Sequence, residues 1–314
     1  MTTSSIEHAL RRHVSVLCDE IGSRSGAEPE SLERARNYIA QTLREMGYGV
    51  TLQSYDYASP VHAASLTAAN VIARATGPER APKREFGERP DILIGAHYDT
   101  VAGTVGADDN TSAVAVLLET AHLLKDENRP LRFAAFTLEE APYFFTSKQG
   151  SRQYVRRFGK EIAAALVLEM VGYTCAHQDY PMPLRWAGYP KTGDFIGVIG
   201  DGRSRRLVCD VARAFKSIGD LPTESLWVPL GGWLLPAVRL SDHASFWDRG
   251  VPAVMITDTA FMRNPNYHLA SDRPETLDFG FMAKVVRATA AAARALTDGI
   301  GDGKGAGQEG AHGG

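Results

Sequence analysis

Residues 95–112 combine a histidine with several carboxylates in the segment GAHYDTVAGTVGADDNTS. His97 and Asp99 are separated by one residue, so on an extended chain both side chains face the same way. Asp99 can then accept the ring N–H that a metal-bound imidazole donates. The pair Asp108 and Asp109 follows a glycine-rich turn and precedes a predicted helix. One interpretation is metal binding, and the other is a hydrogen-bonded histidine followed by a helix cap.

Three glutamates follow predicted apolar strands. Glu139 and Glu140 come directly after LRFAAFTL, and Glu169 follows AALVL. Adjacent carboxylates repel one another, so burial of both requires a cation or a proton. One could bind a metal while the other acts as a general base, and the alternative is a solvated loop. An unpartnered buried glutamate is costly, so Glu169 indicates either a metal ligand or a buried ion pair.

Two further histidines lie in polar segments nearer the C-terminus. His243 belongs to SDHASF, and His268 belongs to NPNYHLASD, with Tyr267 beside it and Asp272 four residues on. Spacing alone leaves open which of the two is a ligand and which a surface residue. The other histidines lie on predicted helices, in loops or in the tail, where metal binding is not expected.

Together these side chains offer nitrogen and oxygen ligands without thiolates. Such a set suits Zn²⁺ or another divalent first-row metal. Five ligand groups exceed the roughly three protein ligands of a single catalytic zinc. An aspartate shared by two ions about 3.5–4 Å apart would account for all of them.

The elements that must position these residues alternate between strands and helices. Alternation of apolar and polar residues predicts a strand over 50–57, and further strands are predicted over 70–75, 92–96, 131–138, 162–168, 195–199 and 253–257. Helical spacing predicts helices over 8–21, 31–46, 112–124, 148–157, 205–218 and 282–296. This alternation indicates an α/β three-layer sandwich with a mostly parallel, mixed central sheet flanked by helices. Ligands bind outside the carboxyl ends of such strands, where His97 and the three glutamates are expected.

Composition excludes several classes of protein. The net charge of −3 provides no broad positive field for nucleic acid or an anionic membrane. No apolar run approaches the ~18 residues of a membrane span, and the N-terminus MTTSSIEHALRR lacks the apolar segment of a secretory signal. Cys18, Cys175 and Cys209 form no recognisable pair, which favours a reducing compartment. We therefore expect a cytoplasmic protein without nucleic-acid or membrane partners.

A single domain is expected over residues 1–298. Residues 77–90 are charged and rich in glycine and proline, which predicts an exposed loop rather than a domain linker. Residues 299–314 read GIGDGKGAGQEGAHGG and have too little apolar surface to pack. They are predicted to be a disordered tail.

The motifs together resemble those of the co-catalytic di-zinc aminopeptidases, whose superfamily also contains glutamate carboxypeptidases and glutaminyl cyclases. In the family's order and at its spacing, the chain contains HYD, GADDN, LEEAP, LEM, SDHASFWDRGVPA and NPNYHLASD, between about Asn37 and Leu296. Each motif is weak alone, but the ordered set is specific. The resemblance implies a zinc-exopeptidase-like fold. Without a signal peptide or protease-associated domain, the chain looks more like a cytosolic bacterial branch.

The resemblance also implies a role for each candidate residue. The metal ligands would be His97 and Glu169 for one ion, Glu140 and His268 for the other, and Asp109 bridging both. Glu139 would be the general base, and Asp99 would orient His97. The family often has a non-proline cis peptide after the bridging aspartate, here Asp109–Asn110. The family more often has aspartate where this chain has Glu169, and the longer acid would shift the ions slightly.

The implied activity is that of a zinc metallopeptidase of the aminopeptidase type, acting on peptides with a free N-terminus. Two divalent ions, with Zn²⁺ as the expected metal, would lower the pKa of a bridging water, and Glu139 would take its proton. Tyr267 either donates to the developing oxyanion or packs against the site. The alternatives are a single-zinc relative of glutaminyl cyclase, a carboxypeptidase or amidohydrolase, and a non-enzymatic binding protein.

Substrate preference and assembly stay open at this point. The segments 143–145 and 226–235 are apolar. Either they line a pocket for the substrate's first side chain, or they belong to the core or to a dimer face. The sequence therefore leaves a homo-oligomer open.

Overall fold

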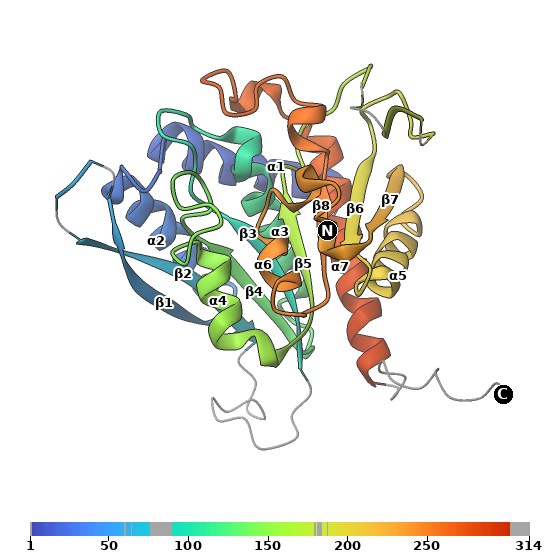
Figure 1. The fold of residues 1–314 in the computed structure, drawn as a ribbon, viewed down its shortest axis with the longest axis horizontal. Coiled ribbons are helices and arrows are strands. Elements are labelled where there is room, and N and C mark those ends of the chain that lie inside the picture. Colours follow the sequence, from blue (N-terminus) through green and yellow to red (C-terminus); the bar gives the residue numbers. More distant parts are fainter. Residues whose placement is uncertain are drawn as a thin grey trace.

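Eight strands form one continuous sheet in the computed structural model (Figure 1). The structure describes residues 2–59, 61–63, 65–75, 90–178, 180, 184–186 and 188–301. The strands are β1 (Tyr48–Ala58), β2 (Ser65–Ala75), β3 (Asp91–His97), β4 (Leu131–Phe136), β5 (Ile162–Glu169), β6 (Ile196–Asp201), β7 (Thr223–Val228) and β8 (Ala253–Thr257). Their order across the sheet is β1-β2-β4-β3-β5-β8-β6-β7.

The centre of the sheet is parallel. β3 pairs in parallel with β4 and with β5, and β5 pairs in parallel with β8. Every residue of β3, β4 and β8 is buried, as expected for parallel strands covered on both faces. The pairs β1–β2, β2–β4 and β6–β8 are antiparallel, while β7 runs parallel to β6. The predicted α/β class with a mostly parallel, mixed sheet is confirmed.

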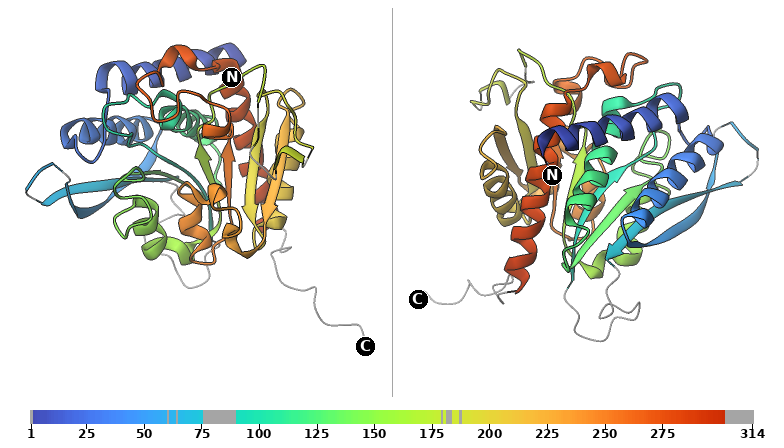
Figure 2. Two further views of the ribbon diagram at one scale, coloured as in Figure 1. Left: turned by 45° about the horizontal axis from the view of Figure 1, so that its top comes forward. Right: turned by 180° about the vertical axis from the view of Figure 1, so that it is seen from behind.

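Helices cover both faces of this sheet (Figures 1 and 2). They are α1 (Thr3–Ser15), α2 (Pro29–Glu45), α3 (Ala113–Leu124), α4 (Gly150–Phe158), α5 (Arg205–Lys216), α6 (His243–Trp247) and α7 (Phe279–Gly301). Helices α4 and α6 lie on the face turned to the viewer in Figure 1, and the others lie behind it. The sheet has one hydrophobic core on each face, and alternate side chains of β3 contribute to each. Ile94 packs in the larger core and Leu93 in the smaller one.

Two elements were absent from the sequence prediction. β7 lies at the sheet edge, where only its first and last residues are buried, so it lacks the continuous apolar run of the central strands. Helix α6 has only five residues, too few to show a helical period. At the N-terminus, α1 begins earlier than predicted, at Thr3, because the Thr2 side chain accepts a hydrogen bond from the Ser5 amide. Residues Val16–Ile21 then form a π-helix rather than continuing α1.

The last helix runs further than predicted. Helix α7 ends at Gly301 rather than near Leu296, so residues 299–301 are helical although the tail was expected from Gly299. A formed helix adds residues more easily than it starts, which explains how it continues over weak helix formers. The remainder of the predicted tail, 302–314, and the predicted loop at 77–89 lie outside the described residues. Within the described part of the chain, no helix is long and apolar enough to cross a membrane.

Candidate metal centre

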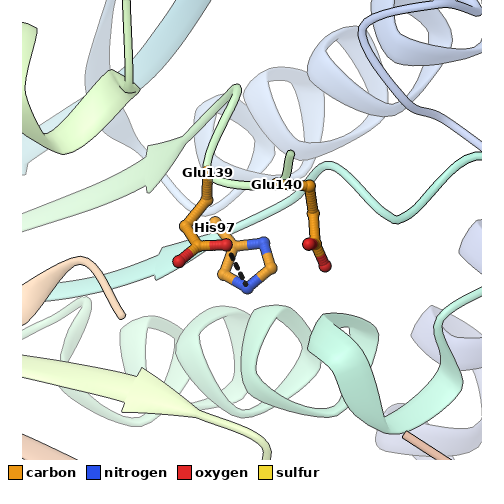
Figure 3. Close-up of side chains that lie close together, drawn as sticks. All are labelled: His97, Glu139 and Glu140. Atoms are coloured by element: carbon orange, nitrogen blue, oxygen red, sulfur yellow. Dashed lines mark ion pairs between the residues drawn. The ribbon is translucent and has the colours of Figure 1, made fainter. Parts of the chain in front are cut away.

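The candidate residues converge at the carboxyl ends of the central strands. His97 is the last residue of β3, and Glu169 is the last residue of β5. Beyond β4, Leu138 has a left-handed backbone with φ of 56°, and Glu139 and Glu140 follow it. Figure 3 shows these two glutamate side chains on either side of the His97 ring. Strand ends therefore position four of the candidate side chains, as the sequence indicated.

One group of ligand atoms surrounds the Nε2 atom of His97. This atom lies 3.4 Å from Oδ1 of Asp109 and 3.4 Å from Oε2 of Glu169. Oε2 of Glu139 is further away, at 3.9 Å. All four side chains are buried. His97, Asp109 and Glu169 thus form a compact three-residue group, with Glu139 beside it.

A second group shares Asp109 with the first. Nε2 of His268 lies 3.1 Å from Oδ2 of Asp109 and 3.5 Å from Oε2 of Glu140. Asp109 therefore directs one oxygen to each histidine. His268 is the outermost member, with a side chain 37% exposed, and it has a left-handed backbone in the loop after β8. The adjacent Asp108 turns away and accepts hydrogen bonds from Gly172 and Asn264.

The arrangement fits divalent metal ions. His97 Nε2 is buried yet has no hydrogen-bond partner. Ligand atoms 2.0–2.1 Å from a tetrahedral zinc ion lie about 3.3 Å from one another, close to the 3.1–3.5 Å separations within the two groups. Each group offers two carboxylates and one imidazole without a thiolate. This donor set suits zinc-type ions, and its buried negative charge requires cations.

The pKa shifts of the bare side chains express the same need for positive charge. Burial raises the pKa of Glu139 well above its usual value, and the neighbouring Glu140 and Glu169 charges raise it further. Burial and the Asp109 charge raise the pKa of Glu140 to about 7. Burial opposes protonation of His97, but the Glu169 and Glu139 charges raise its pKa well above the usual value. The cluster thus takes up protons when no cation neutralises it.

Asp99 positions both the histidine and the glutamates. Its carboxylate accepts hydrogen bonds from the backbone amides of Glu139 (3.1 Å) and Glu140 (3.0 Å). Nδ1 of His97 lies 3.2 Å from the Asp99 backbone oxygen and 3.6 Å from the Asp99 carboxylate. The expected contact between His97 and Asp99 is therefore made mainly through the backbone. The carboxylate holds the turn that carries the two glutamates, which the sequence did not indicate.

Three other supporting residues were not predicted. Ser241 donates a 2.6 Å hydrogen bond to Oε2 of Glu169. The Asp272 carboxylate accepts hydrogen bonds from the amides of Asp108 and Asp109. Asn110 follows a cis peptide bond and ties the turn to β5 through Leu168 and Met170. Ser241 and Asp272 lie within motifs that the sequence singled out, but their partners are remote in sequence and carry no local signal.

The two C-terminal histidines have different environments. His268 is at the centre, whereas His243 is buried at the start of α6. Its Nε2 lies 2.7 Å from the carbonyl oxygen of Val238, and its ring packs edge-on against Trp247. The ring of Tyr267 stacks on that of His268, with centroids 3.7 Å apart. Tyr267 thus packs against the site, and its hydroxyl is close enough to the acidic cluster for the Asp109 and Glu140 charges to add to burial in raising its pKa.

An apolar pocket adjoins the centre. Glu169 and Tyr267 form part of its wall, and the rest includes Ile199, Met255 and Met262. A second, mainly apolar pocket shares Ile199 and Met262 and continues to Tyr180, Phe195 and Leu226. Of the two apolar segments noted in the sequence, residues 143–145 do not line either pocket, and 226–235 contributes only Leu226. Trp233 and Leu234 in that segment are 66% and 72% exposed.

Comparison with known proteins places this geometry in a family. The model of the family described as Peptidase family M28 matches residues 70–293, which include every candidate ligand. The chain belongs to peptidase family M28. A relative from Escherichia coli K12, described as the uncharacterized protein YfbL, is 34% identical over 292 residues, covering 88% of this chain and 84% of its own length. Aminopeptidase YwaD of Bacillus subtilis is 30% identical over 171 residues, covering 52% of this chain but only 31% of that protein.

Solved structures show the same fold. BSAP, a zinc aminopeptidase from Bacillus subtilis, superposes with a TM-score of 0.68 at 17% identity, covering 91% of this chain and 93% of that chain. A glutaminyl cyclase from Porphyromonas gingivalis gives a TM-score of 0.66 at 18% identity, covering 94% of this chain and 98% of that chain. Membership of peptidase family M28 confirms the sequence prediction of a metallopeptidase, and the relatives and structural neighbours named here include aminopeptidases.

Proposed function

We propose that this M28 protein hydrolyses the N-terminal peptide bond of peptides with a free N-terminus, using two zinc ions and Glu139 as general base. One observation carries the proposal. The buried carboxylate of Asp109 faces His97 with one oxygen and His268 with the other, and Glu169 and Glu140 complete the two groups. A single ion would leave one of these groups with unneutralised buried charge.

The ligand roles follow from the two groups. One ion would be held by His97, Glu169 and Asp109, and the other by His268, Glu140 and Asp109. When bound, such ions make hydroxide available near neutral pH and polarise the scissile carbonyl. Ser241 fixes the Glu169 carboxylate by its hydrogen bond. Asp99 fixes Glu140 through its backbone amide.

Glu139 is a carboxylate beside the ligand groups that neither group needs as a ligand. Its Oε2 lies 3.9 Å from His97 Nε2, further than the ligand oxygens of Asp109 and Glu169. It accepts a proton from the attacking water and returns it to the leaving amine. The hydrogen bond from its amide to Asp99 holds the turn from which it extends. Tyr267 is proposed to donate to the developing oxyanion from its place against His268.

The substrate is oriented by charge and by the pocket. Its α-amino group would approach Glu139 and Glu169, whose oxygens lie 3.9 and 3.4 Å from His97 Nε2. Its first side chain would enter the apolar pocket that Glu169, Ile199, Met255 and Met262 help to line. We therefore propose a preference for apolar N-terminal residues such as leucine and phenylalanine. A cytoplasmic location and the lack of nucleic-acid and membrane partners stay predictions from the sequence, and a homo-oligomer stays open.

Metal content and turnover test the proposal together. We would measure zinc per chain in the purified protein and the hydrolysis of Leu-, Ala- and Glu-p-nitroanilide with and without a chelator. Two equivalents of zinc, chelator-sensitive turnover and faster release from the leucine substrate are expected. One equivalent without release would favour a cyclase or an amidase instead. No bound metal would point to a binding protein.

A further inference from the structure

Arg24 is a fully buried cation that the catalytic proposal does not use. Its side chain is 0% exposed, in the loop between the π-helix and α2. A buried arginine normally pairs with a carboxylate, as Arg132 does with Asp91 and Glu161. Among the described residues, no carboxylate lies within ion-pair distance of Arg24. Every hydrogen-bond acceptor of its guanidinium is a backbone carbonyl or a hydroxyl group.

The carbonyls of Leu17 and Gly22 are two of those acceptors, and the other three belong to the segment that carries His97 and Asp109. Nε donates to the carbonyl of Tyr98 (2.6 Å), which lies between His97 and Asp99. Nη1 donates to the carbonyl of Val105 (2.9 Å), and Nη2 donates to Oγ1 of Thr111 (2.5 Å). The Arg24 amide also donates to Oγ1 of Thr100. One side chain therefore joins the strand end that presents His97 to the turn that presents Asp109.

Thr111 links Arg24 to the turn that contains Asp109. Its hydroxyl accepts from Arg24 and donates to the Gly106 carbonyl at 2.6 Å. The turn between Gly106 and Thr111 contains Asp109, whose two oxygens face the two histidines. On the other side of the turn, Asp272 holds the Asp109 amide. Arg24 and Asp272 thus fix the same turn from different directions.

The positive charge of Arg24 and its hydrogen bonds would affect metal binding in opposite directions. The guanidinium donates to the carbonyl of Tyr98, which lies between His97 and Asp99, so its positive charge lies next to the centre. If only its charge mattered, removal of that charge would strengthen metal binding, because like charges repel. If its hydrogen bonds matter, their removal would weaken metal binding by loosening the ligand geometry. The direction of the change in affinity therefore identifies the role.

We propose that Arg24 is a positioning residue for the metal centre, which fixes the separation between His97 and Asp109 by joining the Tyr98 carbonyl to the Thr111 hydroxyl. This inference rests on the proposed function, because it requires that the centre bind metal. It adds a residue that lies more than 70 positions before the first ligand and contacts no ligand side chain.

The test compares Arg24→Lys and Arg24→Gln with Thr111→Val and Thr111→Ser. Arg24→Lys keeps the charge but loses the planar fork, and Arg24→Gln loses the charge as well. Thr111→Val removes the acceptor with little change in shape, and Thr111→Ser restores it. Arg132→Lys is the matched control, because it alters a buried arginine whose partners are not candidate ligands. Zn²⁺ affinity would be measured by competition with a chromophoric chelator, and ligand geometry by the Co²⁺ absorption spectrum.

We expect both Arg24 variants and Thr111→Val to bind Zn²⁺ ~10–100-fold more weakly, with shifted Co²⁺ bands. Thr111→Ser should recover wild-type affinity, and Arg132→Lys should lose thermal stability but keep its affinity. Unchanged or tighter Zn²⁺ binding in Arg24→Gln and Thr111→Val would overturn the inference. If the Arg24 variants do not fold, the two Thr111 variants decide. A wild-type protein that binds no Zn²⁺ would instead refute the proposed function.

Discussion

Asp99 and Asp272 each accept hydrogen bonds from two consecutive backbone amides, and in both cases a proposed ligand supplies one of them. Asp99 holds the amides of Glu139 and Glu140, and Asp272 holds those of Asp108 and Asp109, all at 2.9–3.1 Å. Both acceptors are nearly fully buried. Two turns that each contain adjacent acids are thereby fixed through their backbones, which leaves the carboxylates of Glu140 and Asp109 free to face the centre.

Replacement of Glu139 separates proton transfer from metal binding. We expect Glu139→Gln to lower kcat by ~10²–10⁴, the usual contribution of a general base, while two zinc equivalents remain bound. Glu140→Gln is the matched comparison, because it removes a proposed ligand and should lose metal. Steady-state kinetics and metal analysis on the same preparations distinguish the two. Near-normal turnover in Glu139→Gln would show that another group takes the proton.

Metal stoichiometry tests the shared role of Asp109. Its two oxygens face different histidines, so Asp109→Ala should lose both ions. His268→Ala removes a ligand from only one group and should keep about one equivalent, because the other group is complete without it. Atomic absorption after gel filtration would give the counts. Two retained equivalents in Asp109→Ala would rule out a bridging carboxylate.

Substrate selectivity tests the pocket. Met262 lines both apolar cavities and lies in a short surface turn, so Met262→Trp should fill the space without disturbing the sheet. We expect kcat/KM for leucine and phenylalanine p-nitroanilides to fall ~10-fold or more relative to alanine p-nitroanilide. Leu52→Trp, at an exposed position on β1, is the control. An equal effect on all three substrates would place the first side chain elsewhere.

The pH dependence of stability tests the buried state of His243. Burial lowers its pKa from 6.5 to about 4, and its Nδ1 has no hydrogen-bond partner. As the pH falls below 6.5, the unfolded chain binds a proton at this residue that the folded chain does not bind until about pH 4. Folding stability is therefore lost across that window, by up to about 3 kcal/mol.

His243→Gln is the variant that isolates this effect, because its amide can still donate to Val238 but does not titrate. Urea unfolding of the metal-free proteins from pH 7 to pH 4 would compare the two free energies of unfolding. The difference, wild type minus His243→Gln, should decrease as the pH falls. Other titrating groups are common to both proteins and cancel. A constant difference would mean that His243 has the same pKa in the folded protein as in the unfolded chain.

The strand ends were predictable because the central strands are buried on both faces. β3 and β5 appear in the sequence as unbroken apolar runs, so His97 and Glu169 stand out as the polar residues that end them. β7 gave no such signal because its outer side faces solvent. The family motifs supplied His268, whose loop has no periodic pattern.

The residues that support the ligands could not be predicted in the same way. Ser241 and Asp272 reach their partners only because of how their loops fold. Arg24 donates to backbone carbonyls, which every residue possesses. Any type of residue can provide a backbone carbonyl or amide, so the residue type does not reveal that its backbone accepts or donates such a hydrogen bond. Only the three-dimensional arrangement connects Arg24 with Tyr98 and Thr111.

The proposed ligands come from five separate segments between His97 and His268, and strands from both halves of the chain separate them. No short fragment therefore contains a complete binding site, in contrast to a zinc finger, whose ligands lie close together in sequence. During synthesis, the centre can form only after His268 has emerged and β8 has joined β5. The nascent chain would therefore have no peptidase activity until the sheet is assembled.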